Sequence, residues 1–161
     1  MVTKEDLANI KFIRHEELKS SAFVTAADLS RFTENRKLAD KVYNKIKSYS
    51  KENNIKNKYE SMIEICQISD TSMKRSCNGT QKITRTFLYK LTVGLKMSLD
   101  EANEYFMLCG GPLTEFCLED QICRCALRDK DDILVFIKQF NEIIKQHDKF
   151  QKTDKLKVIT K

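Results

Sequence analysis

Residues 68–111 read ISDTSMKRSCNGTQKITRTFLYKLTVGLKMSLDEANEYFMLCGG, and this stretch decides the fold. It contains three helical patterns. Before each stands a hydroxyl or acidic residue that can accept hydrogen bonds from first-turn backbone amides: Ser69 or Asp70, Thr84, and Ser98. The pairs at 78–79 (Asn-Gly) and 110–111 (Gly-Gly) favour the left-handed backbone that ends helices. The stretch therefore predicts three short helices, over residues 70–77, 85–95 and 99–108.

Helical periodicity continues on both sides of this stretch. In residues 35–49, apolar side chains recur at spacings of four, one, three and three, which predicts one amphipathic helix. A polar connection at 50–54 leads to a further helix from Tyr59 onward. Downstream, residues 118–127 and 133–144 each carry a helical apolar period.

The two ends of the chain have weaker patterns. Residues 1–34 hold scattered apolar side chains that fit one or two short helices packed on the main body, with a helix start at Thr25. Residues 145–161 contain six lysines and two aspartates and little apolar period. We expect this end to be a fraying helix that becomes a mobile basic tail over 148–161.

Composition supports an all-α architecture. The 161 residues include only four glycines and one proline, which leaves little of the turn chemistry that all-β and Rossmann folds need. An apolar content of 41% is enough to form a buried core in a chain of this length. The patterns together predict about seven or eight helices and no strand.

The sequence also indicates a location and a redox state. No run approaches the ~18 apolar residues that a membrane span requires, and the start, MVTKEDL, lacks the basic and apolar regions of a secretion signal. We expect a cytoplasmic protein without membrane association. In that reducing compartment the six cysteines are expected to be reduced, small, buried hydrophobes: Cys66, Cys77, Cys109, Cys117, Cys123 and Cys125.

A zinc site is the alternative use of the last four cysteines. They are separated by seven, five and one residues, and neither a paired Cys-x-x-Cys nor a helical His-x-x-x-His accompanies them. We therefore expect no metal, and nothing in the sequence indicates another cofactor.

Charge is divided unevenly along the chain, whose net charge is +6. Residues 71–97 contain six basic residues and no acid, whereas residues 98–120 contain six acids and no base. This reversal predicts a positive face next to a negative one. The basic run crosses a turn between two helices, where a phosphate backbone would be met. Ordinary solvated helix surface is the alternative.

The order of these elements resembles the Cro/cI-type (Xre-like) helix-turn-helix family. In that family an apolar-Ser step opens the recognition helix, an Asn/Gly turn ends it, and a Ser/Thr-capped fourth helix leads to a fifth helix. The resemblance covers roughly residues 38–110 and rests on four segments: 68–75, 78–79, 83–91 and 94–102. The continuation from Gly110 is similar to an extension of such modules in proteins of low-GC Gram-positive bacteria.

The resemblance implies a division of the chain into four parts. These are an N-terminal helical extension (1–34), a five-helix Cro/repressor-like core (35–110), a C-terminal helical extension packed on it (111–147) and the basic tail (148–161). Four positions depart from the family pattern: Lys58-Tyr59 replace a Thr-Gln pair, Ile63 replaces Ala, and Gln67 replaces Gly. A larger side chain at a close helix crossing changes how two helices pack.

The resemblance further implies a DNA-binding transcriptional regulator. Its recognition helix would enter the major groove of double-stranded DNA, with base edges contacted by Asp70, Thr71, Ser72, Lys74 and Arg75. The mouth of the next helix would clamp the phosphate backbone with Gln81, Lys82, Thr84 and Arg85. The basic side chains are expected on solvated surface, whereas Met73 is expected to turn into the core.

A protein-interaction module is the other hypothesis. Such a module keeps the helix-turn-helix frame without binding DNA, as in an antitoxin, a phage-encoded inhibitor or an adaptor. The acidic stretch 100–120 and the helical extensions favour this hypothesis, and the basic run favours DNA. A broad apolar arc in residues 133–144 also predicts a homodimer through the C-terminal helix, with burial inside the monomer as the alternative. No enzyme is expected, since neither His15 nor His147 has a recognisable catalytic partner.

Overall fold

The computed structural model describes residues 1–8, 12–14 and 27–159, and the side chains of residues 1–8, 12–14 and 34–149. These residues form a short 3₁₀ turn and seven α-helices: η1 (Glu5–Leu7), α2 (Ala27–Glu52), α3 (Lys58–Cys66), α4 (Asp70–Cys77), α5 (Arg85–Gly94), α6 (Leu99–Phe106), α7 (Leu118–Asp129) and α8 (Ile133–Ile159). The only extended pairing within the described ranges is an isolated bridge between Ile13 and Cys117. The all-α prediction is confirmed. None of the helices described is both long and apolar enough to cross a membrane.

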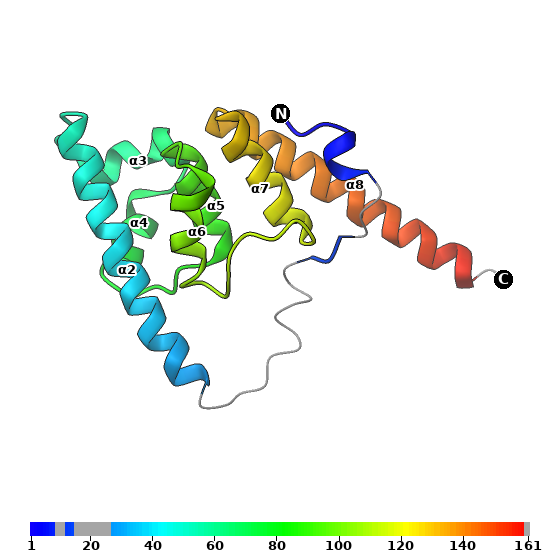
Figure 1. Cartoon of the computed structure of the whole chain (residues 1–161), viewed down its shortest axis with the longest axis horizontal. Helices are drawn as coiled ribbons and strands as arrows, with labels where there is room; N and C mark the ends of the chain where they lie inside the picture. Colours follow the sequence, from blue (N-terminus) through cyan, green and yellow to red (C-terminus); the bar gives the residue numbers. More distant parts are fainter. Residues whose placement is uncertain (9–11, 15–26, 160–161) are drawn as a thin grey trace.

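The helices form two groups that share α5. Figure 1 shows α2 to α6 gathered together, with α7, α8 and the N-terminal segment on the other side of the molecule. Helix α5 packs against α3 and α6 of the first group and against α7 and α8 of the second. Its side chains Leu88 and Leu91 are fully buried, so α5 is the centre of a single core.

The predicted caps of the three short helices are confirmed. The hydroxyls of Ser69, Thr84 and Ser98 each accept a hydrogen bond of 3.1 Å from the backbone amide three residues later. Each of these bonds satisfies one of the backbone donors that a helix start leaves unpaired. Helix α4 ends before Asn78, and Gly79 takes a φ of +81°.

The ends of the chain differ from the predictions. Helix α2 runs unbroken from Ala27 to Glu52, so the expected boundary between residues 34 and 35 lies inside a helix, and the expected connection at 50–54 begins only after residue 52. The predicted start at Thr25 lies outside the described residues. Helix α8 continues to Ile159, through most of the region in which a mobile basic tail is predicted, and its Lys and Gln residues are good helix formers that extend a helix once begun.

The apolar arc of the C-terminal helix is partly used inside the monomer. Ile133 and Phe136 are buried, and the ring of Phe140 lies 5.8 Å from the ring of Tyr89 on α5. This burial is against α5 and α7. Leu134 and Val135 stay exposed. A homodimer through α8 remains a prediction, with a smaller free apolar surface than the periodicity indicated.

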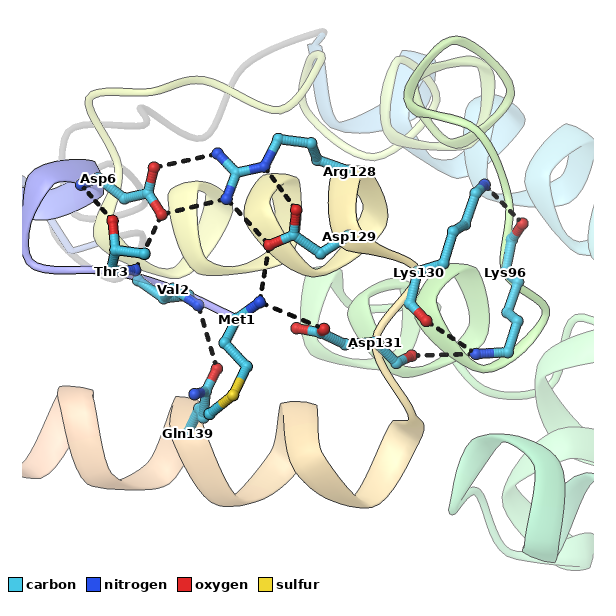
Figure 2. A network of polar contacts seen from close by, with 10 residues as sticks. All are labelled: Met1, Val2, Thr3, Asp6, Lys96, Arg128, Asp129, Lys130, Asp131 and Gln139. Atoms are coloured by element: carbon cyan, nitrogen blue, oxygen red, sulfur yellow. Dashed lines mark hydrogen bonds and ion pairs between the residues drawn. The ribbon is translucent and has the colours of Figure 1, made fainter.

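Two lysines join the ends of α5 and α7, as Figure 2 shows. Lys96 and Lys130 both have left-handed backbone conformations, with φ of 54° and 52°. The Nζ atom of Lys96 donates to the carbonyl of Lys130 at 3.1 Å, and Nζ of Lys130 donates to the carbonyl of Lys96 at 3.0 Å. Each ammonium therefore lies at the carboxyl end of the other helix, where a positive charge is favourable.

Helices α3 and α5 cross closely at Gly94. A Cβ atom added there would lie 2.5 Å from the carbonyl oxygen of Ile65 and 2.8 Å from Cα of Cys66. Ile63, whose size was expected to change how the two helices of the helix-turn-helix pack, points to solvent and is 43% exposed. The fold therefore accommodates Ile63 because its side chain lies outside the core, and the close approach of α3 to α5 depends separately on Gly94.

Gly94→Ala is expected to destabilise the protein by about 1–3 kcal/mol or more, because backbone atoms of α3 would have to move. In an unobstructed helix the same substitution stabilises the protein by up to ~1 kcal/mol. The sign of the change in unfolding free energy therefore tells whether α3 obstructs this position. The measurement is chemical denaturation, with Thr86→Ala at an exposed position of α5 as the control. A Gly94→Ala protein as stable as the wild type would contradict the close crossing.

Candidate nucleic-acid interface

The helix expected to read DNA, α4, has one side in the core and the other in solvent. Met73 and Cys77 are buried, which confirms the expectation that Met73 turns inward. Thr71, Lys74 and Arg75 are exposed. The outer side of α4 therefore offers a hydroxyl group and two cations to solvent.

The two cations of α4 differ in their surroundings. Nζ of Lys74 lies 3.0 Å from the carboxylate of Asp70, one turn earlier, and 5.9 Å from the ring centre of Tyr59. For Arg75, no side-chain hydrogen bond or ion pair is found within the described part of the chain. An exposed i,i+4 pair contributes little, so a phosphate can compete with Asp70 for Lys74. Arg75 can donate to a ligand without first leaving another partner.

A groove lies between the starts of α4 and α5. It is lined by Gln67, Ile68, Ser69, Ser72, Gln81, Lys82, Thr84, Thr86, Phe87 and Lys90. The side-chain amide of Gln81 donates to the Ser72 hydroxyl at 3.4 Å. The fold therefore brings four of the predicted contact residues, Ser72, Gln81, Lys82 and Thr84, into one groove beside the exposed side of α4.

Lys90 belongs to this groove and was missed by the sequence analysis. Its Nζ donates to the carbonyl oxygen of Gln67 at 3.2 Å, at the turn between α3 and α4. Gln67 has a φ of 56°, which explains why glycine is the more common choice at that turn. The acid-free run contained the signal for Lys90, but only the packing of α5 on α3 brings this residue to the turn.

Arg85 lies elsewhere, and the expectation that it is a solvated surface residue is wrong. Its side chain is 13% exposed, and its guanidinium forms a bidentate ion pair with Asp120. Nη2 donates to Oδ2 at 2.7 Å, and Nε donates to Oδ1 at 3.3 Å. The same group donates to the carbonyls of Cys109 and Gly111 at 3.0 and 2.9 Å. It also lies 4.9 Å from the ring centre of Phe106. The reason for assigning Arg85 a phosphate contact is therefore lost.

The carboxylate of Asp120 has two further partners. It accepts hydrogen bonds from the hydroxyl of Tyr89 on α5 and from the backbone amide of Thr114. Burial and the neighbouring carboxylate raise the pKa of Tyr89 far above its usual value, so this phenol stays a neutral donor. Asp120 thus joins the start of α5, the loop before α7 and α7 itself.

The acidic run is largely neutralised within the molecule. Four of its six acids pair with basic residues from other segments: Glu101 with Lys45 at 2.6 Å, Glu104 with Lys41 at 3.4 Å, Glu119 with Arg14, and Asp120 with Arg85. The predicted negative face is therefore weaker than the sequence indicated. The acidic stretch gives correspondingly less support to an interaction with a basic protein.

The cysteines are spread through the core. All six are free thiols, five of them buried and Cys109 half-buried. Within the described ranges, no group of three or more His, Cys, Asp or Glu side chains is arranged to hold a metal ion. Burial raises the pKa of Cys66 to about 12 and that of Cys77 to about 11.

Arg85→Ala is expected to lower the unfolding free energy by about 3 kcal/mol or more, because it leaves Asp120 buried without its ion-pair partner. Lys82→Ala, at an exposed position of the basic run, is the control and should stay within ~0.5 kcal/mol of the wild type. Urea denaturation of both variants measures the difference. Equal stability of the two variants would show that Arg85 is not held as described.

Stability is expected to fall as the pH rises from about 9 toward 11. The unfolded chain ionises its thiols near pKa 9.0, whereas the folded chain keeps Cys66 protonated up to about 12 and Cys77 up to about 11. The unfolded state therefore binds fewer protons in this window, and unfolding becomes more favourable. Denaturation midpoints at pH 8, 9 and 10 test this, and Cys66→Ala should reduce the slope. An unchanged slope in that variant would contradict the assignment to Cys66.

Comparison of this chain with models of known protein families, with curated proteins and with solved structures finds no match. The candidate interface is consequently defined by its geometry: the exposed side of α4, with Thr71, Lys74 and Arg75, and the groove that leads from it to the start of α5.

Proposed function

We propose that this protein binds double-stranded DNA through α4 and the adjoining groove, and that it is a cytoplasmic transcriptional regulator. The observation that carries the proposal is the pairing of α3 and α4 across a tight turn, which leaves the outer side of α4 exposed with its cations. Helices α2 to α6 would then correspond, in order, to the five helices of a Cro/repressor-like core.

The dimensions of α4 are compatible with the major groove. Eight helical residues are about 12 Å long, close to the ~12 Å width of that groove in B-DNA. Arg75 can make paired hydrogen bonds to guanine, and Thr71 can contact a base or a phosphate. These two residues are the best candidates for sequence reading.

Backbone contacts would come from the groove beside α4. Lys82 and Lys90 supply positive charge, and Gln81 supplies an amide donor. The amino end of α5, capped by Thr84, adds the positive end of a helix dipole. Phosphate contacts of this kind position a protein on the duplex without reading its sequence.

A protein-interaction function is the second candidate, favoured by large apolar side chains that are exposed outside α4. Met107, Phe116 and Leu134 are 56%, 61% and 60% exposed. Apolar residues at such exposure can contribute to a partner surface. The two candidates differ in salt dependence, because only the DNA interface releases counterions from a phosphate backbone.

The combined substitutions Lys74→Ala, Arg75→Ala and Lys82→Ala should sharply weaken binding to duplex DNA. Each lost phosphate contact lowers the slope of log affinity against log salt by about one. Fluorescence anisotropy with duplexes chosen from a random-sequence pool, at several salt concentrations, measures both the affinity and the slope.

The matched control replaces Lys4, Lys138 and Lys145, three exposed lysines away from α4, and so removes the same charge. This control should keep most of the affinity. Equal losses of DNA affinity in the two variants would show that binding depends on net charge alone and would contradict an interface at α4. A wild-type protein without salt-sensitive affinity for any duplex would overturn the proposal in favour of the second candidate.

A further inference from the structure

The N-terminal segment, residues 1–8 and 12–14, lies along α7 and α8; we call it the strap. Figure 2 shows its first part, where the carboxylate of Asp6 forms a bidentate ion pair with the guanidinium of Arg128 on α7, at 3.0 and 3.2 Å. The backbone amide of Val2 donates to the side chain of Gln139 on α8 at 3.4 Å. The strap thus contacts both α7 and α8.

The second part of the strap is held by backbone pairing and by a buried charge. The amide of Ile13 donates to the carbonyl of Phe116 at 2.9 Å, and the amide of Leu118 donates to the carbonyl of Ile13 at 3.1 Å. Next to it, Arg14 forms ion pairs with Glu119, which is fully buried, and with Asp148. These contacts fix both the register and the direction of the strap.

Every described hydrogen bond of the strap to another part of the chain goes to α7, to α8 or to the turns beside them. None reaches α2, the helix that follows the strap along the chain. Among the described residues of the strap no side chain is buried, although Val2, Leu7 and Phe12 pack at the edge of the core. The strap is therefore a ligand-like segment that covers a surface already formed by other elements.

We infer that this surface also accepts the strap of a second copy, so that two chains exchange residues 1–14 and form a symmetric dimer. The contacts made between copies are the same as those made within one chain. Exchange therefore creates no unpaired group on α7 or α8, and it is a known low-cost route to dimers. This dimer differs from one in which two α8 helices pack on each other, and it does not depend on DNA binding.

The chemistry of the surface selects a copy of this chain over an unrelated peptide. Glu119 is fully buried and pairs with a guanidinium, and a buried carboxylate deprived of such a partner is strongly destabilising. A replacement strap must supply an arginine for Glu119, and this arginine must directly follow the residue that pairs with Cys117. It must also supply an aspartate for Arg128, eight residues before that arginine. Residues 6–14 of a second copy meet both conditions.

Chain length permits the exchange. Twelve residues, 15–26, separate the strap from the start of α2 at Ala27. A connection of that length can span at most about 45 Å between Arg14 and Ala27. That reach is comparable with the size of a small domain, so the strap of one copy can reach a neighbouring copy.

The test uses Ile13→Cys in the full chain. Ile13 and Cys117 are paired in the bridge, and bridged strands place paired Cα atoms about 4.8 Å apart, within the range of a disulfide. Mild oxidation followed by non-reducing electrophoresis should give a covalent dimer whose share rises with protein concentration. Mixing with a copy enlarged by a tag at its C-terminus before oxidation should give a third band of intermediate size.

The control variant combines Ile13→Cys with Cys117→Ser and should give neither product, which excludes crosslinks through the other cysteines. Circular dichroism and the unfolding midpoint verify that both variants are folded. A disulfide formed only within one chain at every concentration would overturn the exchange. A wild-type protein that stays monomeric in sedimentation at every concentration would overturn it too.

Discussion

The buried carboxylate of Asp120 is the interaction on which the two groups of helices depend. It meets Arg85 and Tyr89 from α5 and the amide of Thr114 from the loop before α7. Taking a charge out of water costs several kcal/mol, which only well-placed partners can offset. The position of α7 relative to α5 is therefore specified by polar geometry as well as by apolar packing.

This interaction also determines which cations remain on the candidate interface. Arg85 is the first residue of α5 and lies next to the groove in sequence, yet its charge is used to bind Asp120. Among the side chains that the structure describes, Lys74, Arg75 and Lys82 have no comparable buried partner, and they stay at the surface. Two neighbouring acids of α7 thus bind arginines from different parts of the chain: Glu119 binds the strap and Asp120 binds α5.

Local features of the fold could be predicted from the sequence, because they depend on neighbouring residues. The caps at Ser69, Thr84 and Ser98 are bonds between residues three apart, and the inward position of Met73 follows from helical period. Features that depend on distant residues could not be predicted in this way. The direction of Arg85 depends on a carboxylate 35 residues away, and the pairing of Ile13 with Cys117 has no sequence signal at all.

The contact between Lys96 and Lys130 has a consequence for how this chain can change over evolutionary time. At either position, glycine would suit the left-handed backbone better than lysine. The same exchange would remove the ammonium group that neutralises the opposite helix end. A substitution to glycine at either lysine therefore relieves backbone strain at its own position and destabilises the end of the other helix. The change in stability on substituting the second lysine depends on whether the first has already been substituted. The two positions are expected to drift together, as one epistatic pair, although 34 residues separate them.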